Sequence, residues 1–215
     1  MMKPPVYTIK KIKPGIDFKT LSPSHFVKAL PLCFKETVSG KAPRQKGEAR
    51  LVYSNATLFA WFDLEEATPI AALTRHDDPL YTENVVELFI DPLGLGSIYY
   101  EIEVNPLNAS FDAIIINDIG KGNRRGARFQ GFTAWNPKSL KHRSIASAGK
   151  WQVFLSVDFA DLFLAKRIPP KKGDVWQGNI LRIDFNGKDT EYCAWSPTRV
   201  LDFHNTNAFG KWVFE

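Results

Sequence analysis

The chain has 215 residues, a formal net charge of +5, and a composition that is 44% hydrophobic and 24% charged, which suits one β-sandwich or barrel domain spanning residues 1–215. No apolar stretch approaches the length of a membrane span, and the N-terminus lacks the continuous apolar segment of a secretory signal. The chain as written is therefore predicted to be cytoplasmic, or secreted or periplasmic if a signal has been removed.

The first predicted feature in chain order is an N-terminal segment, residues 1–34, that wraps onto the domain. Its apolar side chains would each contribute about 1.5–3 kcal/mol when fully buried; they are Ile9, Ile12, Ile16, Phe18 and Leu21. Segments rich in β-branched and aromatic residues then recur between turn signals. They are Arg50–Ser54, Thr57–Asp63, Val85–Asp91, Ile98–Asn105, Phe111–Asn117, Trp151–Phe159, Asn179–Asn186, Thr190–Trp195 and Phe209–Phe214.

Helical signals are brief, and they occur only at Ser24–Leu30 and Ala160–Lys166. Neither segment alternates with the strands as a βαβ architecture would require. The pattern therefore predicts an all-β fold, an antiparallel β-sandwich with one or two short helices.

The strands Val85–Asp91 and Ile98–Asn105 are predicted to form an antiparallel hairpin, because the Gly-rich connection Pro92–Ser97 between them is short. In each strand one face is apolar and the other carries glutamates. The apolar sets are Val86, Leu88 and Ile90 in the first strand and Tyr100, Ile102 and Val104 in the second. If both sets face one core, Glu87 lies opposite Glu101 or Glu103.

Like charges opposite one another in a sheet are destabilising by up to about 1 kcal/mol, so a sequence that keeps them is expected to use them. A cation, an arginine or a polyhydroxylated ligand over this face would offset the repulsion. Arg182 is the candidate partner, because it alternates with apolar residues in Asn179–Asn186. The alternatives are an internal ion pair between the glutamates and Arg182, or a plain solvated outer face.

Several other signals favour no special chemistry. Cys33 and Cys193 are far apart and have no CxxC or histidine-rich context, so both are predicted to be reduced and buried. The basic segment Gly120–Arg128 lacks the strand-to-helix context and the Lys-Ser/Thr ending of a P-loop, so it is interpreted as a basic loop and not as a phosphate cradle.

Five segments of the sequence carry a family resemblance, in the order Tyr81–Pro92, Tyr99–Pro106, Trp151–Phe159, Gly178–Phe185 and Trp195–Phe214. With these motifs the chain resembles carbohydrate-binding module family 9 in its stand-alone, single-domain form. The resemblance implies a sandwich of jelly-roll or immunoglobulin-like character. It also implies non-catalytic binding of a sugar between two aromatic rings, with charged and amide side chains on the hydroxyls.

The resemblance assigns roles to particular positions. Tyr81 falls where the family has its first stacking aromatic residue, and Glu87 falls on the motif glutamate. The second stacking position lies in the loop before the last strand, where this chain offers Phe203 and His204 in place of a tryptophan. The complete set of predicted ligand-binding residues is Tyr81, Glu87, Glu103, Asn105, Arg182, Trp195, Phe203 and His204.

Structural calcium is also implied by the resemblance, and carboxylates suit such a hard cation. The candidate calcium ligands are Asp77, Asp78, Asp91 and Glu101, although they form no contiguous calcium loop. No other cofactor is predicted. The expected partner is a mono-, oligo- or polysaccharide, with no nucleic acid and no membrane, and the chain is expected to act as a monomer.

The sequence is compatible with two other classes of function. A glycoside hydrolase or lyase needs paired carboxylates about 5–10 Å apart, which Glu87 and its neighbour across the hairpin can supply. Carboxylates side by side on one sheet face do not, however, flank a scissile bond. A nucleic-acid-binding module is suggested by the basic loops, but the basic residues are scattered and are balanced by 23 acidic ones.

Overall fold

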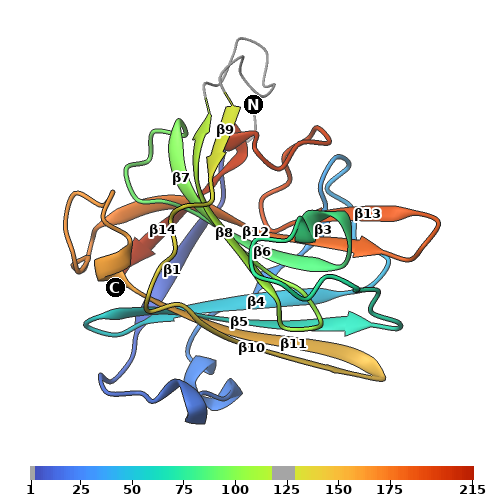
Figure 1. Cartoon of the computed structure of the whole chain (residues 1–215). Coiled ribbons are helices and arrows are strands. Elements are labelled where there is room, and N and C mark those ends of the chain that lie inside the picture. Colours follow the sequence, from blue (N-terminus) through green and yellow to red (C-terminus); the bar gives the residue numbers. More distant parts are fainter. Residues whose placement is uncertain (1–2, 118–128) are drawn as a thin grey trace.

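The computed structural model describes residues 3–117 and 129–215, so the basic segment Gly120–Arg128 lies outside the described residues. Fourteen strands of the described residues join into one sheet, which curls back on itself as a sandwich of two layers (Figure 1). The predicted all-β sandwich is confirmed. Because β-branched and aromatic side chains dominate the strands, each layer presents an apolar face that only the other layer can cover.

The first layer contains β14 (Gly210–Phe214), β12 (Val175–Phe185), β6 (Val85–Asp91), β7 (Ile98–Val104), β8 (Ser110–Asn117) and β9 (Phe129–Phe132) in that spatial order. The strand β13 (Thr190–Ala194) also pairs with β12, and β3 (Lys35–Glu36) pairs with β13. The second layer contains β10 (Lys141–Ser147), β11 (Gly149–Asp158), β5 (Thr57–Glu66) and β4 (Gly47–Tyr53), with β2 (Leu32–Cys33) beside β4.

The strand β1 (Val6–Lys11) joins the two layers. Its first part, Val6–Ile9, pairs in parallel with β14, and Lys10 and Lys11 pair in parallel with β4. The main core fills the space between the layers, where the indole of Trp151, the indole of Trp212 and the ring of Phe62 are buried. The strand β1 therefore closes the sandwich. The sequence did not predict a strand in this segment.

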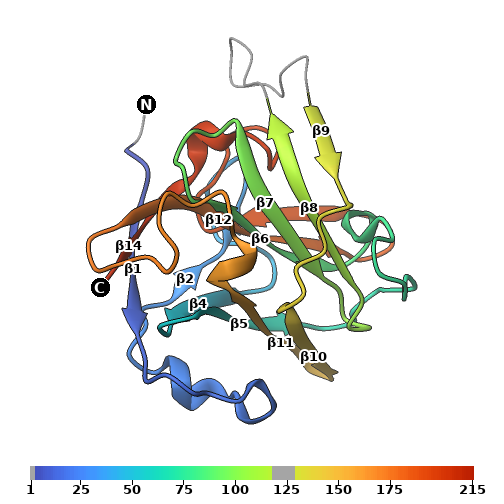
Figure 2. The ribbon, with the colours of Figure 1, turned by 60° about the vertical axis from the view of Figure 1, so that its left-hand side comes forward.

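The N-terminal segment after β1 crosses the outer face of the second layer, as Figure 2 shows at the bottom of the view. Its buried residues, Leu21, Phe26 and Ala29, pack against side chains of the sheet, which are Val52, Phe59 and Phe154. The predicted packing of this segment onto the sandwich is therefore present.

The expected short helices are reduced to single 3-10 turns. At Ser24–Leu30 the structure has η2 (Pro23–Phe26), and at Ala160–Lys166 it has η4 (Phe159–Asp161). The other turns are η1 (Phe18–Thr20), η3 (Leu80–Thr82) and η5 (Thr206–Ala208). Throughout the described ranges, no helix has the length and apolar character needed to cross a membrane.

The hairpin of β6 and β7 has the predicted register. Glu87 pairs directly with Glu103, and the apolar set of each strand faces the core between the layers. The opposite face is also largely buried, because a second apolar cluster covers it, with Phe89, Tyr99 and Phe209 among its members. The glutamate-bearing face of β6 and β7 is therefore not the plain solvated face that was one alternative from the sequence.

Arg182 does not lie among these glutamates, so that expectation is wrong. It pairs with Val86 across β12 and β6, and Val86 faces the core between the layers. The guanidinium is fully buried there and forms an ion pair with Glu66 of β5 at 2.9 Å. The sequence showed the alternation within β12 but not which of its two faces would meet the second layer.

The two cysteines are both free, but only Cys193 is buried. Cys33 is exposed, contrary to the expectation of two buried thiols. Leu32 of the same short strand β2 is buried, so alternation along the strand turns the neighbouring thiol outward.

Candidate functional site

The outer face of the first layer is hollowed into a pocket of about 730 Å³. Its lining comes from β13, β12, β6, β7, β8 and β9, which are neighbours in the sheet, and from the loops before β6 and before β14. The lining residues are Tyr81, Glu87, Glu101, Phe111, Ile115, Phe129, Gly131, Thr133, Ile183, Tyr192, Leu201, Asp202, Phe203 and His204. A volume in this range suits a small organic ligand.

Three glutamates meet at the floor of the pocket. Glu87 is 2% exposed, Glu101 is 6% exposed and Glu103 is fully buried. One carboxylate oxygen from each lies within 4.8 Å of the others. Glu87 and Glu101 line the pocket directly, whereas Glu103 is not among its lining residues and lies beside them in the sheet.

Burial raises the pKa of Glu87 well above its ordinary value, and the negative charge of Glu101 adds to the shift. Burial likewise raises the pKa of Glu103 well above its ordinary value, and there the charges of Glu87 and Glu101 add to it. Both effects oppose ionisation, so protons are retained in this cluster at pH values where an exposed glutamate has lost its own. A protonated carboxyl donates a hydrogen bond, whereas an ionised one only accepts.

Aromatic side chains stand at both ends of this row of carboxyls. Tyr81, on the turn before β6, is 51% exposed and meets Phe111 of β8 edge to face at 6.3 Å between ring centroids. Tyr192, on β13, meets Phe203 in the same manner at 5.7 Å. The glutamates are carried by the strands between these two pairs.

His204 belongs to the pocket wall and is held by its neighbours. Its Nδ1 atom is 2.7 Å from the hydroxyl of Tyr99, and its ring stacks on Phe89 with centroids 5.1 Å apart. Phe129 of β9 contacts the same imidazole at 4.5 Å between centroids. The histidine therefore fixes the loop against the sheet and presents only part of its ring to the pocket.

Four of the predicted ligand-binding residues line one pocket: Tyr81, Glu87, Phe203 and His204. Asn105 does not, because it is fully buried and its amide is used inside the fold. Its Nδ2 donates to the Leu73 carbonyl at 2.8 Å and to Glu83 at 2.7 Å, and its Oδ1 accepts from the Ala109 amide at 2.8 Å.

Trp195 also lies outside the pocket lining. Its indole packs against the core between the layers and meets Tyr7 edge to face at 6.2 Å. Trp195 and Arg182 are absent from the pocket lining for the same reason, because both side chains lie on the inner side of the first layer. No predicted residue of the inner side reaches the ligand pocket.

The candidate calcium ligands do not converge on one site. Asp91 accepts hydrogen bonds from the amides of its own turn, at Leu93, Gly94 and Gly96. Asp78 is paired with Arg75 at 3.2 Å, and Glu101 belongs to the pocket floor. Calcium takes six to eight oxygen ligands, which these dispersed carboxylates do not supply together.

Several lining residues were missed from the sequence, and alternation would have found two of them. Phe111 pairs with Glu103 and Tyr192 pairs with Ile183, so both point to the pocket side by the two-residue period of a strand. Leu201, Asp202 and Thr133 come from irregular segments, where no periodic signal exists.

A sequence model of carbohydrate-binding family 9 matches residues 39–214 of the chain. An extracellular protein from Arthroderma benhamiae is 28% identical over 206 residues, which cover 86% of this chain and 89% of the relative.

Solved structures share the fold over nearly the whole chain. A candidate carbohydrate-binding protein from Bacteroides uniformis matches with a TM-score of 0.76 and 18% identity, covering 99% of this chain and 100% of that one. A family 9 carbohydrate-binding module from Caldicellulosiruptor kristjanssonii in complex with glucose gives 0.66 at 11% identity, covering 98% and 95%. The module in complex with cellotriose gives 0.67 at 10% identity, covering 98% and 93%. At these identities the structural likeness concerns the fold alone.

Proposed function

The chain belongs to carbohydrate-binding family 9, and from that premise we propose that it binds a carbohydrate in the pocket of its first layer and catalyses no reaction. The observation that carries the proposal is the arrangement of the pocket, in which aromatic pairs stand at both ends of a row of buried carboxyls. The complexes of the Caldicellulosiruptor module with glucose and cellotriose support the choice of ligand class.

The physical match is between the two kinds of surface on a sugar ring and the two kinds of group in the pocket. The apolar C–H face of a pyranose packs on an aromatic plane, and its rim of hydroxyls needs donors and acceptors in fixed positions. Tyr81 offers the most exposed ring of the lining, and Tyr192 with Phe203 forms the opposing wall. A sugar, terminal on a longer glycan or free, is proposed to lie between them.

Glu87 and Glu101 would bind the hydroxyls at the floor. Because the pKa of Glu87 is raised by burial and by the charge of Glu101, the proposed state has a proton in the carboxyl cluster. One carboxyl then donates to a hydroxyl oxygen while another accepts from a hydroxyl hydrogen. Such a cluster can satisfy both roles of a hydroxyl group with one residue type.

The same geometry disfavours hydrolysis. Glu87, Glu101 and Glu103 are carried by the neighbouring strands β6 and β7, and their carboxyls converge on one another. All the glutamates also lie on one floor, so they approach a ligand from one side. A leaving group and an attacking water need groups on opposite sides of the bond.

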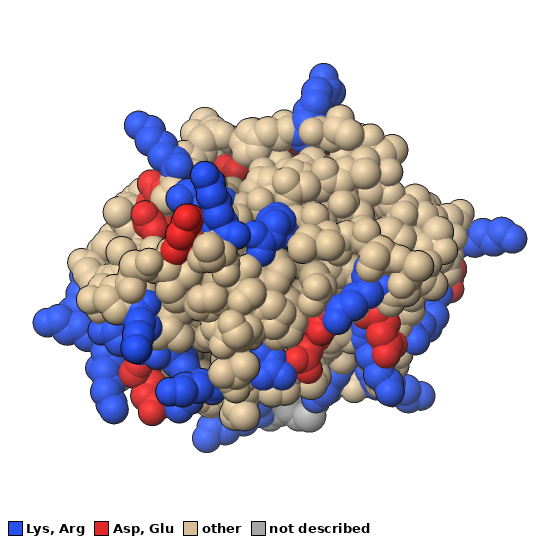
Figure 3. Space-filling view, turned by 90° about the horizontal axis from the view of Figure 1, so that it is seen from below, with Lys and Arg blue, Asp and Glu red and all other residues tan. Residues whose placement is uncertain are grey.

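A nucleic-acid partner has little support. On the face in Figure 3, Lys and Arg side chains are dispersed around the rim with Asp and Glu among them, and they do not align as one track. The carboxyl floor of the pocket would repel phosphates.

A glycan array with the intact chain, read with and without a chelator, tests the proposal. Binding to one class of glycan, with no release of reducing sugar from the bound glycans, is expected. Reducing-sugar release that disappears in Glu87→Gln would replace the binding function with a hydrolase. No glycan binding in either buffer would leave the fold assigned and the proposed function wrong.

The place of action is proposed to be outside the cell. The support is that the Arthroderma relative is an extracellular protein. Immunodetection in culture medium and in washed cells of the source organism tests this, and protein confined to the cells would contradict it.

A further inference from the structure

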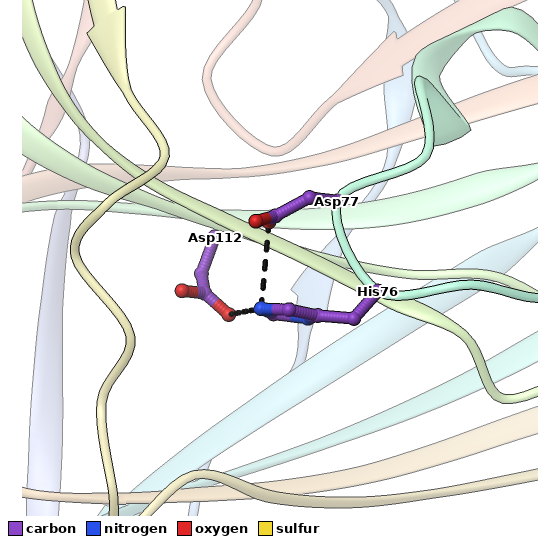
Figure 4. A group of neighbouring side chains, drawn as sticks. All are labelled: His76, Asp77 and Asp112. Atoms are coloured by element: carbon purple, nitrogen blue, oxygen red, sulfur yellow. Dashed lines mark ion pairs between the residues drawn. The ribbon is translucent and has the colours of Figure 1, made fainter.

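A second polar cluster lies behind the pocket, on the other face of β8. Asp112 pairs with Ile102 of β7, so it faces the inner side, whereas its neighbour Phe111 faces the pocket. His76 and Asp77 reach it from the loop between β5 and β6. Figure 4 shows the edge of the His76 imidazole directed toward the carboxyls of Asp77 and Asp112.

The distances around the Nε2 atom of His76 define the cluster. Asp77 Oδ1 lies at 3.5 Å and Asp112 Oδ1 at 3.6 Å. Asn136, from the segment before β10, places its Oδ1 at 2.7 Å from the same nitrogen. Oxygens from three separate segments of the chain therefore surround one imidazole nitrogen.

Asp112 is 1% exposed and lacks the partners that a buried carboxylate needs. Its Oδ2 has no hydrogen-bond partner among the described residues, and its Oδ1 is too far from Nε2 for a hydrogen bond. Asp77 Oδ1 is likewise buried without a hydrogen-bond partner in the described part of the chain. A buried carboxylate left in this state is costly, so the cluster fits a cation that would bind both side chains.

We propose that His76, Asp77 and Asp112 bind a divalent transition metal ion of the zinc class. Ligands of a tetrahedral zinc ion at about 2.0–2.2 Å lie roughly 3.3–3.6 Å apart, which matches the separations of the two carboxylate oxygens from Nε2. Asn136 Oδ1 is closer than two ligands of one ion can be, so it accepts a hydrogen bond from Nε2–H when the ion is not bound.

The donor set selects the class of metal. An imidazole nitrogen with two carboxylates suits zinc, whereas calcium and magnesium take oxygen ligands. Ser110 supports the required tautomer, because its Oγ lies 3.3 Å from Nδ1 and can accept a hydrogen bond from Nδ1–H, leaving Nε2 to bind the ion. The half-exposed ring of His76, at 46%, leaves the cluster open to solvent for metal entry.

Such an ion would fasten the loop before β6 onto β8. The loop continues from Asp77 to Tyr81, whose ring contacts Phe111 on the same strand β8. The metal site itself does not depend on the proposed sugar binding, since it lies on the opposite face of the sheet and no residue of it lines the pocket.

The test uses the intact chain after dialysis against a chelator, with ZnCl2 and CaCl2 as the probes in separate calorimetric titrations. We expect one zinc ion per chain, binding at least tenfold tighter than calcium. At a hundredfold excess over its Kd, zinc should raise the melting temperature by about 5 °C or more. Cobalt should give the visible absorption bands of a tetrahedral site.

Two variants and one control make the assignment specific. Asp112→Asn and His76→Gln should each weaken zinc binding at least tenfold and remove the cobalt bands, and thermal melts establish that each variant is folded. His25→Gln, which changes a histidine of η2 outside the cluster, should bind zinc as the parent chain does. Three results would overturn the proposal: no saturable zinc binding, zinc binding in both cluster variants that equals that of the parent chain, or tighter binding of calcium than of zinc.

Discussion

Tyr81 is the residue on which the proposed recognition depends most. Replacing Tyr81 with alanine removes a half-exposed ring, and stacking on such a ring is worth about 1–3 kcal/mol by analogy with nucleic-acid bases. We expect Tyr81→Ala to weaken glycan binding roughly tenfold or more, as measured by calorimetry.

Phe163→Ala is the matched control. Phe163 is 57% exposed, and it meets Tyr100 edge to face at 6.1 Å, much as Tyr81 meets Phe111, but it does not line the pocket. Equal losses of affinity in both variants would mean that Tyr81 contributes only to packing.

The buried carboxyls Glu87 and Glu103 should make stability depend on pH. Their pKa values are raised in the folded chain by burial first and by neighbouring carboxylates second. The folded state therefore binds protons more tightly than the unfolded state. The contribution of these two carboxyls to stability is greatest below the ordinary glutamate pKa of about 4.3, and it falls as the pH rises from there through the raised pKa values.

Glu103→Gln should make the decrease of stability with rising pH less steep, because the variant has no proton to release at that position. Relative to the parent chain, its melting temperature should increase between pH 5 and pH 8 by about 2–4 °C, the shift that ~1 kcal/mol gives in a domain of this size. Melts are recorded with a chelator present. Parallel pH profiles of the two proteins would show that the cluster is ionised throughout.

A buried ion pair between Arg182 on β12 and Glu66 on β5 links the two layers. Both side chains are no more than 2% exposed, and Arg182 also donates to the Glu65 carbonyl at 2.8 Å. Breaking such a pair from one side leaves a buried charge without its partner, which costs about 3–5 kcal/mol.

We therefore expect Arg182→Met to destabilise the fold by that amount without changing glycan affinity in the chain that remains folded. The double variant Arg182→Met, Glu66→Leu should lose less free energy of unfolding than the sum of the two single variants, since neither member of the ion pair is then left buried without the other. Denaturant unfolding measures both. A loss of glycan affinity in a fully folded Arg182→Met variant would mean that Arg182 takes part in glycan binding after all.

The pairing of strands that are neighbours in sequence was predictable. Which face of a strand meets the core was not, where its partner strands are distant in sequence. The hairpin of β6 and β7 could be derived because a short turn and two alternating patterns fix its register. For β12 the same alternation was visible, but its neighbours in the sheet are distant in sequence. Pairing of Arg182 with Val86, and not with Glu87, depends on that non-local register.

The predicted site residues are brought together only in part, and their role in binding stays a prediction. Tyr81, Glu87, Phe203 and His204 were placed by resemblance to a family and do share one pocket. Asp112 was missed, although a charged residue on the same side of its strand as Ile114 was a usable signal. Asn105 shows the converse limit, because a polar residue beside the site can use its whole amide inside the fold, here on Leu73, Glu83 and Ala109.

Across the whole molecule, the two outer faces of the sandwich differ in what they offer to a ligand. The outer face of the second layer is partly covered by the N-terminal segment, which packs there through Phe26 and Leu21. A second pocket, of about 630 Å³, opens beside β4 and β5, and Cys33, Gly47 and Lys150 are among its lining residues. Among the described residues that line it, Phe34 is the only aromatic one, and none of them belongs to a cluster of buried carboxyls.

The most direct test of the account is to map where a glycan binds. Amide chemical shifts of the isotope-labelled chain are followed during titration with the tightest glycan from the array. The account predicts that the perturbed residues surround the first pocket, including Tyr81, Tyr192 and Phe203. Perturbations centred on Cys33, Gly47 and Lys150, or no saturable change with any glycan, would contradict it.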